Sequence, residues 1–298
     1  MNSLSRKDFA LLALLTLTWG INWPIMKIGV QYFPALSFRA ISMIGGLAAI
    51  WLATRYQKVS LSVPKEQIIP IIKLAIPNML IWHVFMILGV KLLSSGRAAT
   101  LGYTMPLSAS KMPIKARLFF RERINSRALI GILLALSGAL LLLSSEFSKV
   151  SGQPIGTVFA LVAAASWGCG TVMMKRSNIN IPTISLTFWM LVFTSCMMSL
   201  IALVMDHAAL RLPTAIEWAA ITYNAVIVFG FAHVAWFRLA RILPPVASSL
   251  SVMFIPVLGV FAGMAMLGEV PHWQDYAAIL LILAAMSTVL FQSKSKTS

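Results

Sequence analysis

The sequence predicts an all-α integral membrane protein of ten transmembrane helices, built as two inverted five-helix repeats with both termini in the cytoplasm. Three observations lead to this prediction. The 298 residues are 59% hydrophobic and 11% charged, with a mean hydropathy of +0.87, which is more apolar surface than a water-soluble fold of this length can bury. The apolar residues are gathered in long stretches, and the second half of the chain resembles the first.

Ten apolar stretches are long enough to cross a bilayer, which takes roughly 20 residues at a rise of about 1.5 Å each. The first follows a charged start typical of a signal peptide, but its apolar run is too long and lacks a small-residue cleavage site, so we expect a retained helix. Short links join the stretches, and residues 293–298 form a polar tail. The predicted spans are 9–30, 34–54, 69–90, 95–118, 127–145, 154–174, 182–205, 215–237, 245–267 and 273–291.

The cations indicate how these spans are oriented. A net charge of +16 would suggest nucleic-acid binding in a soluble chain, but here most of the lysines and arginines lie between the apolar stretches. With the N-terminus placed in the cytoplasm, sixteen cations fall in inner segments and five at outer ends, as the positive-inside rule predicts for an even number of spans. The outer five are Lys27, Lys91, Arg97, Lys149 and Arg211.

The two halves repeat in sequence. The stretch "TWGINWPIMKIGVQYFP" returns 148 residues later as "SWGCGTVMMKRSNINIP", which aligns Trp19 with Trp167. At a shift of 150, His83 falls on His233. Five spans per half is an odd number, so the second half must cross the membrane inverted, the construction found in secondary transporters that work by alternating access. The predicted units are residues 1–148 and 149–292.

Two tryptophans lie near the middle of the membrane in matched spans. Trp19 is ten residues into the first span, or roughly 15 Å deep, and Trp167 has a similar depth in its own half. The rings either pack between helices, with Gly20 and Gly168 allowing close approach, or line a shared pocket and stack on a substrate. Their midplane position at the repeat interface favours the pocket.

The first span holds further candidates one turn outward. Asn22 can hydrogen-bond a polar group of a ligand, and Trp23 lies beside it. Pro24 frees the carbonyl of Gly20, which at this depth must find a partner or line a wet cavity.

Three further candidate site residues are ionisable and lie inside other spans. Arg39, one turn into the second span, either binds a substrate carboxylate or extends its charged end to the outer surface. His83 and His233 hold matched places at mid-span, where an imidazole can titrate near neutral pH and hydrogen-bond a carboxylate or an ammonium group. A histidine satisfied within the core is the alternative for each.

Four more side chains lie on helices that we expect to face a central pocket, and methionine among them suits a site that accepts several ligands. They are Tyr103, Trp236, Met253 and Phe254.

The other lysines inside spans are interpreted as surface-seeking. Lys111 and Lys115 share a helix face near the cytoplasmic end, where extension to the surface is favoured over a place in the pocket. Lys27 and Lys175 are expected to be interfacial anchors.

Enzyme chemistry is not indicated. All aspartates and glutamates lie near helix ends or in loops, so no mid-membrane carboxylate is expected to relay protons or bind sodium. The chain has no P-loop, no metal-ligand spacing of His or Cys, and no arguable Ser/His/Asp set. We therefore expect no catalytic residue, no metal and no cofactor.

Several motifs together resemble the drug/metabolite transporter superfamily and its EamA branch, and the style is similar to the aromatic amino acid exporters of that branch. These motifs are Trp-Gly in the first and sixth spans, Phe38-Arg39, and Pro256 followed thirteen residues later by Glu269. The resemblance implies a cavity enclosed by the first four spans of each half, with the fifth span of each half outside, and export of small metabolites without ATP. The first half departs from the pattern, because Pro106 and Glu122 are sixteen residues apart, which leaves the end of the fourth helix open.

The sequence thus predicts a multi-pass exporter of the bacterial inner membrane for amino acids, including aromatic ones, running downhill or weakly coupled to protons through a histidine. Its predicted partners are this small-molecule substrate and membrane lipid, without nucleic acid, and its oligomeric state stays open. Two alternatives remain: a carrier for phosphorylated sugars or nucleotide-sugars, and a non-transporting membrane sensor or enzyme, against which the repeat argues. The expected substrate-binding residues are Trp19, Asn22, Trp23, Arg39, His83, Tyr103, Trp167, His233, Trp236 and Met253.

Overall fold

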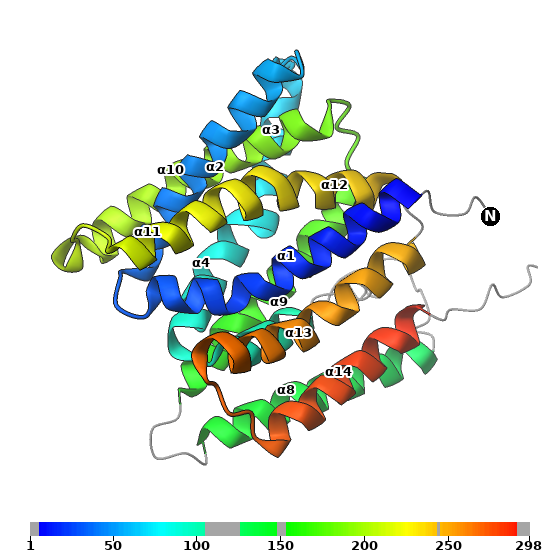
Figure 1. Cartoon of the computed structure of the whole chain (residues 1–298). Coiled ribbons are helices and arrows are strands. Elements are labelled where there is room, and N and C mark those ends of the chain that lie inside the picture. The colour runs from blue at the N-terminus through cyan, green and yellow to red at the C-terminus, as the bar shows by residue number, and fades with distance from the viewer. Residues whose placement is uncertain (1–5, 105–125, 148–152, 243–244, 291–298) are drawn as a thin grey trace, which may run out of the picture.

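The computed structural model describes residues 6–104, 126–147, 153–242 and 245–290, and within them every regular element is a helix (Figure 1). Six helices of this described part are long and apolar enough to cross a membrane, and three others carry shorter apolar stretches. Nine of the ten predicted spans coincide with these helices. The remaining predicted span, 95–118, is described only at its start, where α5 lies. The rest of this span, with Lys111 and Lys115, lies outside the described residues, so the count of ten stays a prediction.

The helices follow the predicted spans closely at their ends. Pro34 and Pro182 directly precede α2 and α10, and Pro154 opens α9, in agreement with the preference of proline for helix starts. The first half comprises α1 (Arg6–Val30), α2 (Ala35–Tyr56), α3 (Lys65–Ala75), η1 (Ile76–Ile81), α4 (Trp82–Leu92), α5 (Ser95–Gly102) and α8 (Ser126–Phe147). The second comprises α9 (Pro154–Arg176), α10 (Thr183–Met205), η2 (His207–Ala209), α11 (Ala215–Thr222), η3 (Tyr223–Ala232), α12 (His233–Ile242), α13 (Pro245–Leu267) and α14 (Trp273–Leu290).

The third span of each half contains a π-helical stretch that the sequence did not reveal. In the first half, η1 joins α3 to α4 and ends directly before Trp82 and His83. In the second half, η3 joins α11 to α12 and ends directly before His233. Such stretches form i→i+5 hydrogen bonds and occur frequently at functional sites. The two matched histidines therefore follow matched irregularities of the backbone.

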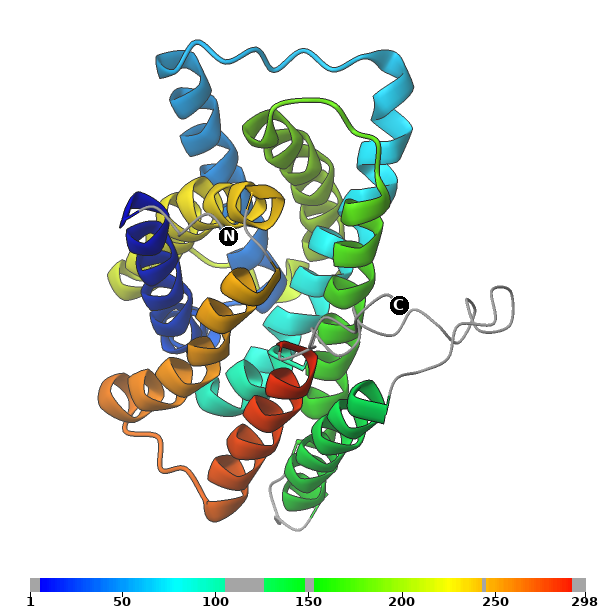
Figure 2. The same ribbon diagram turned by 90° about the vertical axis from the view of Figure 1, so that its right-hand side faces the viewer.

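The helices pack in pairs that mostly join the two halves. α1 packs on α13, and the helices that match them in the repeat, α9 and α5, also pack on each other. The third span of each half packs on the first span of the other half, through α4 on α9 and through η3 on α1. α8 and α14 lie side by side at one edge of the molecule in both views (Figures 1 and 2). This is the peripheral position that the resemblance implied for the fifth span of each half.

Small residues bring α1 and α13 into close contact. A Cβ atom added to Gly20 would lie 2.6 Å from the Cβ atom of Leu258, and one added to Gly259 would lie 3.1 Å from Cδ1 of Trp23. Since real Cβ atoms do not approach this closely, glycine is required at Gly20 for the observed spacing. The close approach holds Trp19 and Trp23 against the neighbouring helices.

At the end predicted to face outward, side chains of one helix satisfy the backbone of another. Nζ of Lys27 donates to the carbonyl oxygens of Val90, Lys91 and Leu93 at 3.1, 2.9 and 2.7 Å, which places a cation at the C-terminus of α4. The carboxylate of Asp206 accepts from the backbone N–H of Ser37 at 2.8 Å and from its hydroxyl at 3.0 Å, at the N-terminus of α2.

The Gly-Glu pair after α13 has the same role for α5. Gly268 ends α13 with a φ of 64°, a conformation that glycine adopts without strain. The turn brings Glu269 to α5, where its carboxylate accepts from the N–H groups of Ser95 and Gly96 at 2.6 and 3.2 Å and from the Ser95 hydroxyl at 2.9 Å. Beside it, the buried Arg97 pairs with Asp275 at 2.6 Å.

We expect Glu269→Ala to lower the free energy of unfolding by about 1–3 kcal/mol, because it leaves the N–H donors of α5 without their acceptor. The melting temperature of the purified protein in detergent measures this. The control is Glu66→Ala, which removes an exposed carboxylate from the first turn of α3 and should cost about 0.5 kcal/mol. Equal melting temperatures for both variants would contradict a capping role for Glu269.

Candidate functional site

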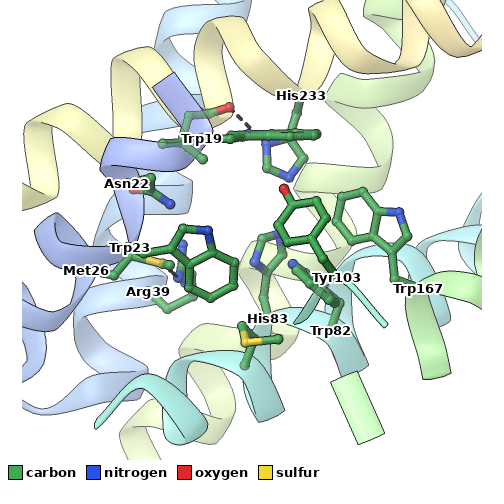
Figure 3. A pocket seen from close by; sticks show the side chains of 12 residues that line it. Trp19, Asn22, Trp23, Met26, Arg39, Trp82, His83, Tyr103, Trp167 and His233 are labelled. Carbon is green, nitrogen blue, oxygen red and sulfur yellow. Dashed lines mark hydrogen bonds between the residues drawn. The ribbon is translucent and has the colours of Figure 1, made fainter. Parts of the chain in front are cut away.

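A cavity of ≈ 40 Å³ lies among α1, α2, α4, α5, α9, η3 and α12 (Figure 3). It is large enough for water but not for a metabolite, so a larger ligand can enter only if the lining side chains or helices move. The elements that line it come from both halves of the chain. The lining residues are Trp19, Asn22, Trp23, Met26, Arg39, Trp82, His83, Met86, Tyr103, Trp167, Val228 and His233.

Eight of the ten residues expected at the site line this cavity: Trp19, Asn22, Trp23, Arg39, His83, Tyr103, Trp167 and His233. The ring of Trp236 is not part of the lining but packs against Trp19, with the ring centroids 5.6 Å apart. The side chain of Met253 lies outside the described residues. Phe254, on a helix expected to face the pocket, does not line the cavity, because its side chain is 64% exposed on the surface of α13.

Aromatic rings form one side of the cavity. Trp19 meets Trp167 edge to face, with centroids 6.2 Å apart, and lies 5.9 Å from His233. Trp167 in turn packs against Trp82 at 4.7 Å. Trp19 and Trp167, matched in the repeat, are thus in direct contact where the two halves meet, and their edge-to-face geometry is the favourable one for aromatic pairs.

The two matched histidines also meet at the cavity. The rings of His83 and His233 are 5.3 Å apart between centroids, and both side chains are buried. Nδ1 of His233 lies 2.8 Å from the carbonyl oxygen of Val228 in η3, so Nδ1 donates and Nε2 is left as an acceptor without a partner. Neither ring nitrogen of His83 has a partner. The hydrogen-bonding capacity of His83 is therefore not satisfied by other protein groups. In the described part of the chain, no group of three or more potential metal ligands occurs.

Arg39 is fully buried, with an exposed fraction of 1%. Its Nη1 donates to Oδ1 of Asn224 at 3.2 Å, its Nη2 contacts Sδ of Met26 at 2.7 Å, and its guanidinium lies 5.5 Å from the centroid of the Phe229 ring. The alternative in which Arg39 extends to the surface is therefore wrong. Depth along a helix suggested it, but the neighbouring α1 and η3 cover this position.

Four lining residues and two residues that hold Arg39 were not predicted from the sequence. Met26 follows Asn22 by four residues and so shares its helix face, a spacing that could have identified it. Met86 follows His83 by three residues and shares its helix face in the same way, whereas Trp82 directly precedes His83 and is not identified by such a spacing. The other three residues lie in η3, and no feature of the sequence predicts its π-helical geometry. They are Asn224, Val228 and Phe229.

Comparison with known proteins places these features in a family. The family model of the EamA-like transporter family matches residues 8–144 and again residues 154–291. A transporter of Bacillus subtilis named "Uncharacterized transporter YoaV" is 27% identical over 260 residues, which cover 85% of this chain and 86% of that protein. The "Probable amino-acid metabolite efflux pump" of Salmonella typhimurium is 23% identical, with 97% of this chain and 96% of that protein covered.

Two further matches agree in extent. The "Uncharacterized inner membrane transporter YedA" of Escherichia coli (strain K12) is 25% identical, with coverage of 94% and 90%. A solved structure described only as "Crystal structure of protein" has a TM-score of 0.67 at 19% identity and covers 96% of this chain and 97% of that one, which shows a shared fold.

The apolar helices and these relatives place the chain in the inner membrane as a multi-pass protein. Because the family model matches nearly the whole chain, the protein belongs to the EamA-like transporter family.

Proposed function

We propose that this transporter exports small metabolites, amino acids including aromatic ones, by alternating access through the central cavity. The observation that carries the proposal is the composition of the cavity wall, which takes Trp19 and His83 from one half and their repeat partners Trp167 and His233 from the other. In transporters built from inverted repeats, the substrate site lies near the midplane at the interface of the repeats.

The chemistry of the wall fits an amino acid with an apolar or aromatic side chain. The indole rings of Trp19, Trp82 and Trp167 offer surfaces on which an aromatic side chain can stack. Met26 and Met86 add soft, adaptable contacts suited to several related ligands. The similarity to a protein named as a probable amino-acid metabolite efflux pump supports the same substrate class.

Alternating access would move the two inverted halves against each other around the cavity. The cross-helix contacts of Lys27, Asp206 and Glu269 all lie at the end predicted to face outward. Opening toward that side would separate helices that these contacts join, and the small size of the cavity fits a conformation closed around its centre. The histidine pair is the candidate for any weak coupling to protons.

A carrier for phosphorylated sugars or nucleotide-sugars is the second candidate, and the buried Arg39 is the observation that favours it. The aromatic wall favours the amino acid, because a phosphorylated sugar presents mostly polar groups, whereas each indole ring offers one N–H donor and an otherwise apolar surface. A sensor or enzyme without transport would not require matched residues from two halves at one cavity.

Counterflow in liposomes tests the proposal directly. With labelled phenylalanine, threonine and a sugar phosphate, we expect exchange of the amino acids, and the same assay with and without a pH gradient tests the proton coupling. Absence of amino acid movement under every gradient would overturn the proposed function, and movement of the sugar phosphate alone would favour the second candidate.

We expect the double variant Trp19→Ala, Trp167→Ala to lower phenylalanine counterflow by about tenfold, because aromatic pairs contribute about 0.5–1.5 kcal/mol each beyond simple burial. Trp51→Ala is the control, since Trp51 lies on α2 with 48% of its side chain exposed and should tolerate the change. Full counterflow by the double variant would show that the two indoles only pack.

Labelling of single cysteines tests the proposed orientation, in which both termini are cytoplasmic. In a background with Cys169 and Cys196 replaced by serine, an impermeant thiol reagent added to intact spheroplasts should label Leu212→Cys but not Gln57→Cys. Both positions are exposed, and they lie in loops predicted to face opposite sides. The reverse labelling pattern would contradict the charge-based orientation.

A further inference from the structure

Unsatisfied polar atoms are concentrated at the cavity. Across the described part of the chain, seven buried side-chain nitrogen or oxygen atoms have no hydrogen-bond partner. Five of them belong to residues that line the cavity: Nε of Arg39, Oδ1 of Asn22, both ring nitrogens of His83, and Nε2 of His233. Because buried polar atoms are normally paired, such a cluster indicates a place where a ligand or water supplies the missing partners.

Arg39 is held in place without being neutralised. Its two Nη atoms contact an amide oxygen and a thioether sulfur, both uncharged, and the Phe229 ring lies beside the guanidinium. The amide of Asn224 is itself oriented, since its Nδ2 donates to the carbonyl oxygen of Ala220 at 3.0 Å. No carboxylate of the described residues forms an ion pair with Arg39. The guanidinium is thus held in position, and its positive charge and Nε–H donor remain available to a ligand.

Two of the residues with unsatisfied atoms, Asn22 and Arg39, lie on the same side of the cavity. Asn22 and Met26 are one helical turn apart on α1, and Met26 touches the guanidinium of Arg39. Figure 3 shows Asn22, Met26 and Arg39 together on the side opposite Trp82 and Trp167. The cavity therefore has a cationic end, where Oδ1 of Asn22 is a free acceptor, and an aromatic end, and the unpaired nitrogens of His83 and His233 also face it.

We propose that Arg39 binds the carboxylate of the transported molecule and that Asn22 accepts a hydrogen bond from its α-amino group, which leaves the side chain among the indole rings. This assignment rests on the proposed function and makes it narrower. Arginine is suited to the role because its planar fork binds a carboxylate through two parallel hydrogen bonds. A buried guanidinium without a counterion disfavours neutral or cationic ligands, so the site selects for a free carboxylate.

Four unlabelled compounds separate the contributions of the two groups in the wild-type protein. In counterflow of labelled phenylalanine, the competitors are phenylalanine, 3-phenylpropionate, phenylalanine amide and inorganic phosphate. Phenylalanine amide, which lacks the carboxylate, should compete at least tenfold more weakly than phenylalanine. We expect 3-phenylpropionate, which lacks only the amino group, to lie between the two. Equal competition by the amide would overturn the assignment, and so would stronger competition by phosphate than by phenylalanine.

Variants of Arg39 and Asn22 give an independent test. Arg39→Gln should weaken binding of phenylalanine at least tenfold while binding of phenylalanine amide is kept or improved, and Arg39→Lys should recover part of the loss. Asn22→Ala should remove the preference for phenylalanine over 3-phenylpropionate. Arg55→Gln, an exposed arginine at the other end of α2, is the matched control and should change neither. A role of Arg39 in folding alone would weaken the acid and the amide equally.

Direct binding separates this proposal from the proposed function. Titration of the purified full-length protein with the same compounds, followed by its tryptophan fluorescence, reports binding without transport. A preference for acid over amide that Arg39→Gln abolishes, in a protein that moves no amino acid, would refute the proposed function and keep the carboxylate site. If Arg39→Gln leaves the counterflow of phenylalanine unchanged, the proposed function is kept and the carboxylate site at Arg39 is refuted.

Discussion

The constraint on which this structure depends is that hydrocarbon supplies no hydrogen bonds, so the protein must satisfy every buried backbone N–H and C=O group itself. Helices do this along their length but leave unpaired groups at each end. In this chain, side chains from other helices satisfy several of those ends: Lys27 for α4, Asp206 for α2 and Glu269 for α5. The requirement that forces the chain into helices thus also joins those helices to one another.

The same constraint makes the cavity distinct from the rest of the interior. Elsewhere in the described residues, buried polar side chains are almost all paired, whereas Asn22, Arg39, His83 and His233 present unpaired atoms to one small space. Aromatic rings form one side of that space. The site is therefore recognisable from its incomplete hydrogen bonding as well as from its shape.

Much of the arrangement could be predicted from the sequence, because the internal repeat identifies residues that face each other across the halves. Depth along a span and the repeat together led to Trp19, His83, Trp167 and His233. Arg39 shows the limit of this reasoning, since its depth was estimated along one helix while its burial is decided by neighbouring helices. The π-helical stretches escaped prediction for another reason. In a span that is apolar on all sides, hydrophobic periodicity carries no information about how the backbone winds.

These π-helical stretches also determine where the chain can change length. A π-helical turn closes its hydrogen bond one residue later than an α-helical turn, so it can absorb the loss of one residue by reverting to an α-helix. Deletion of one residue within η1 or η3 would leave His83 or His233 facing the cavity. Deletion of one residue within α1 or α2 would rotate the side chains that follow in the same helix by about 100°. Evolution can therefore shorten the third span of either half without dismantling the site, a freedom that the first two spans lack.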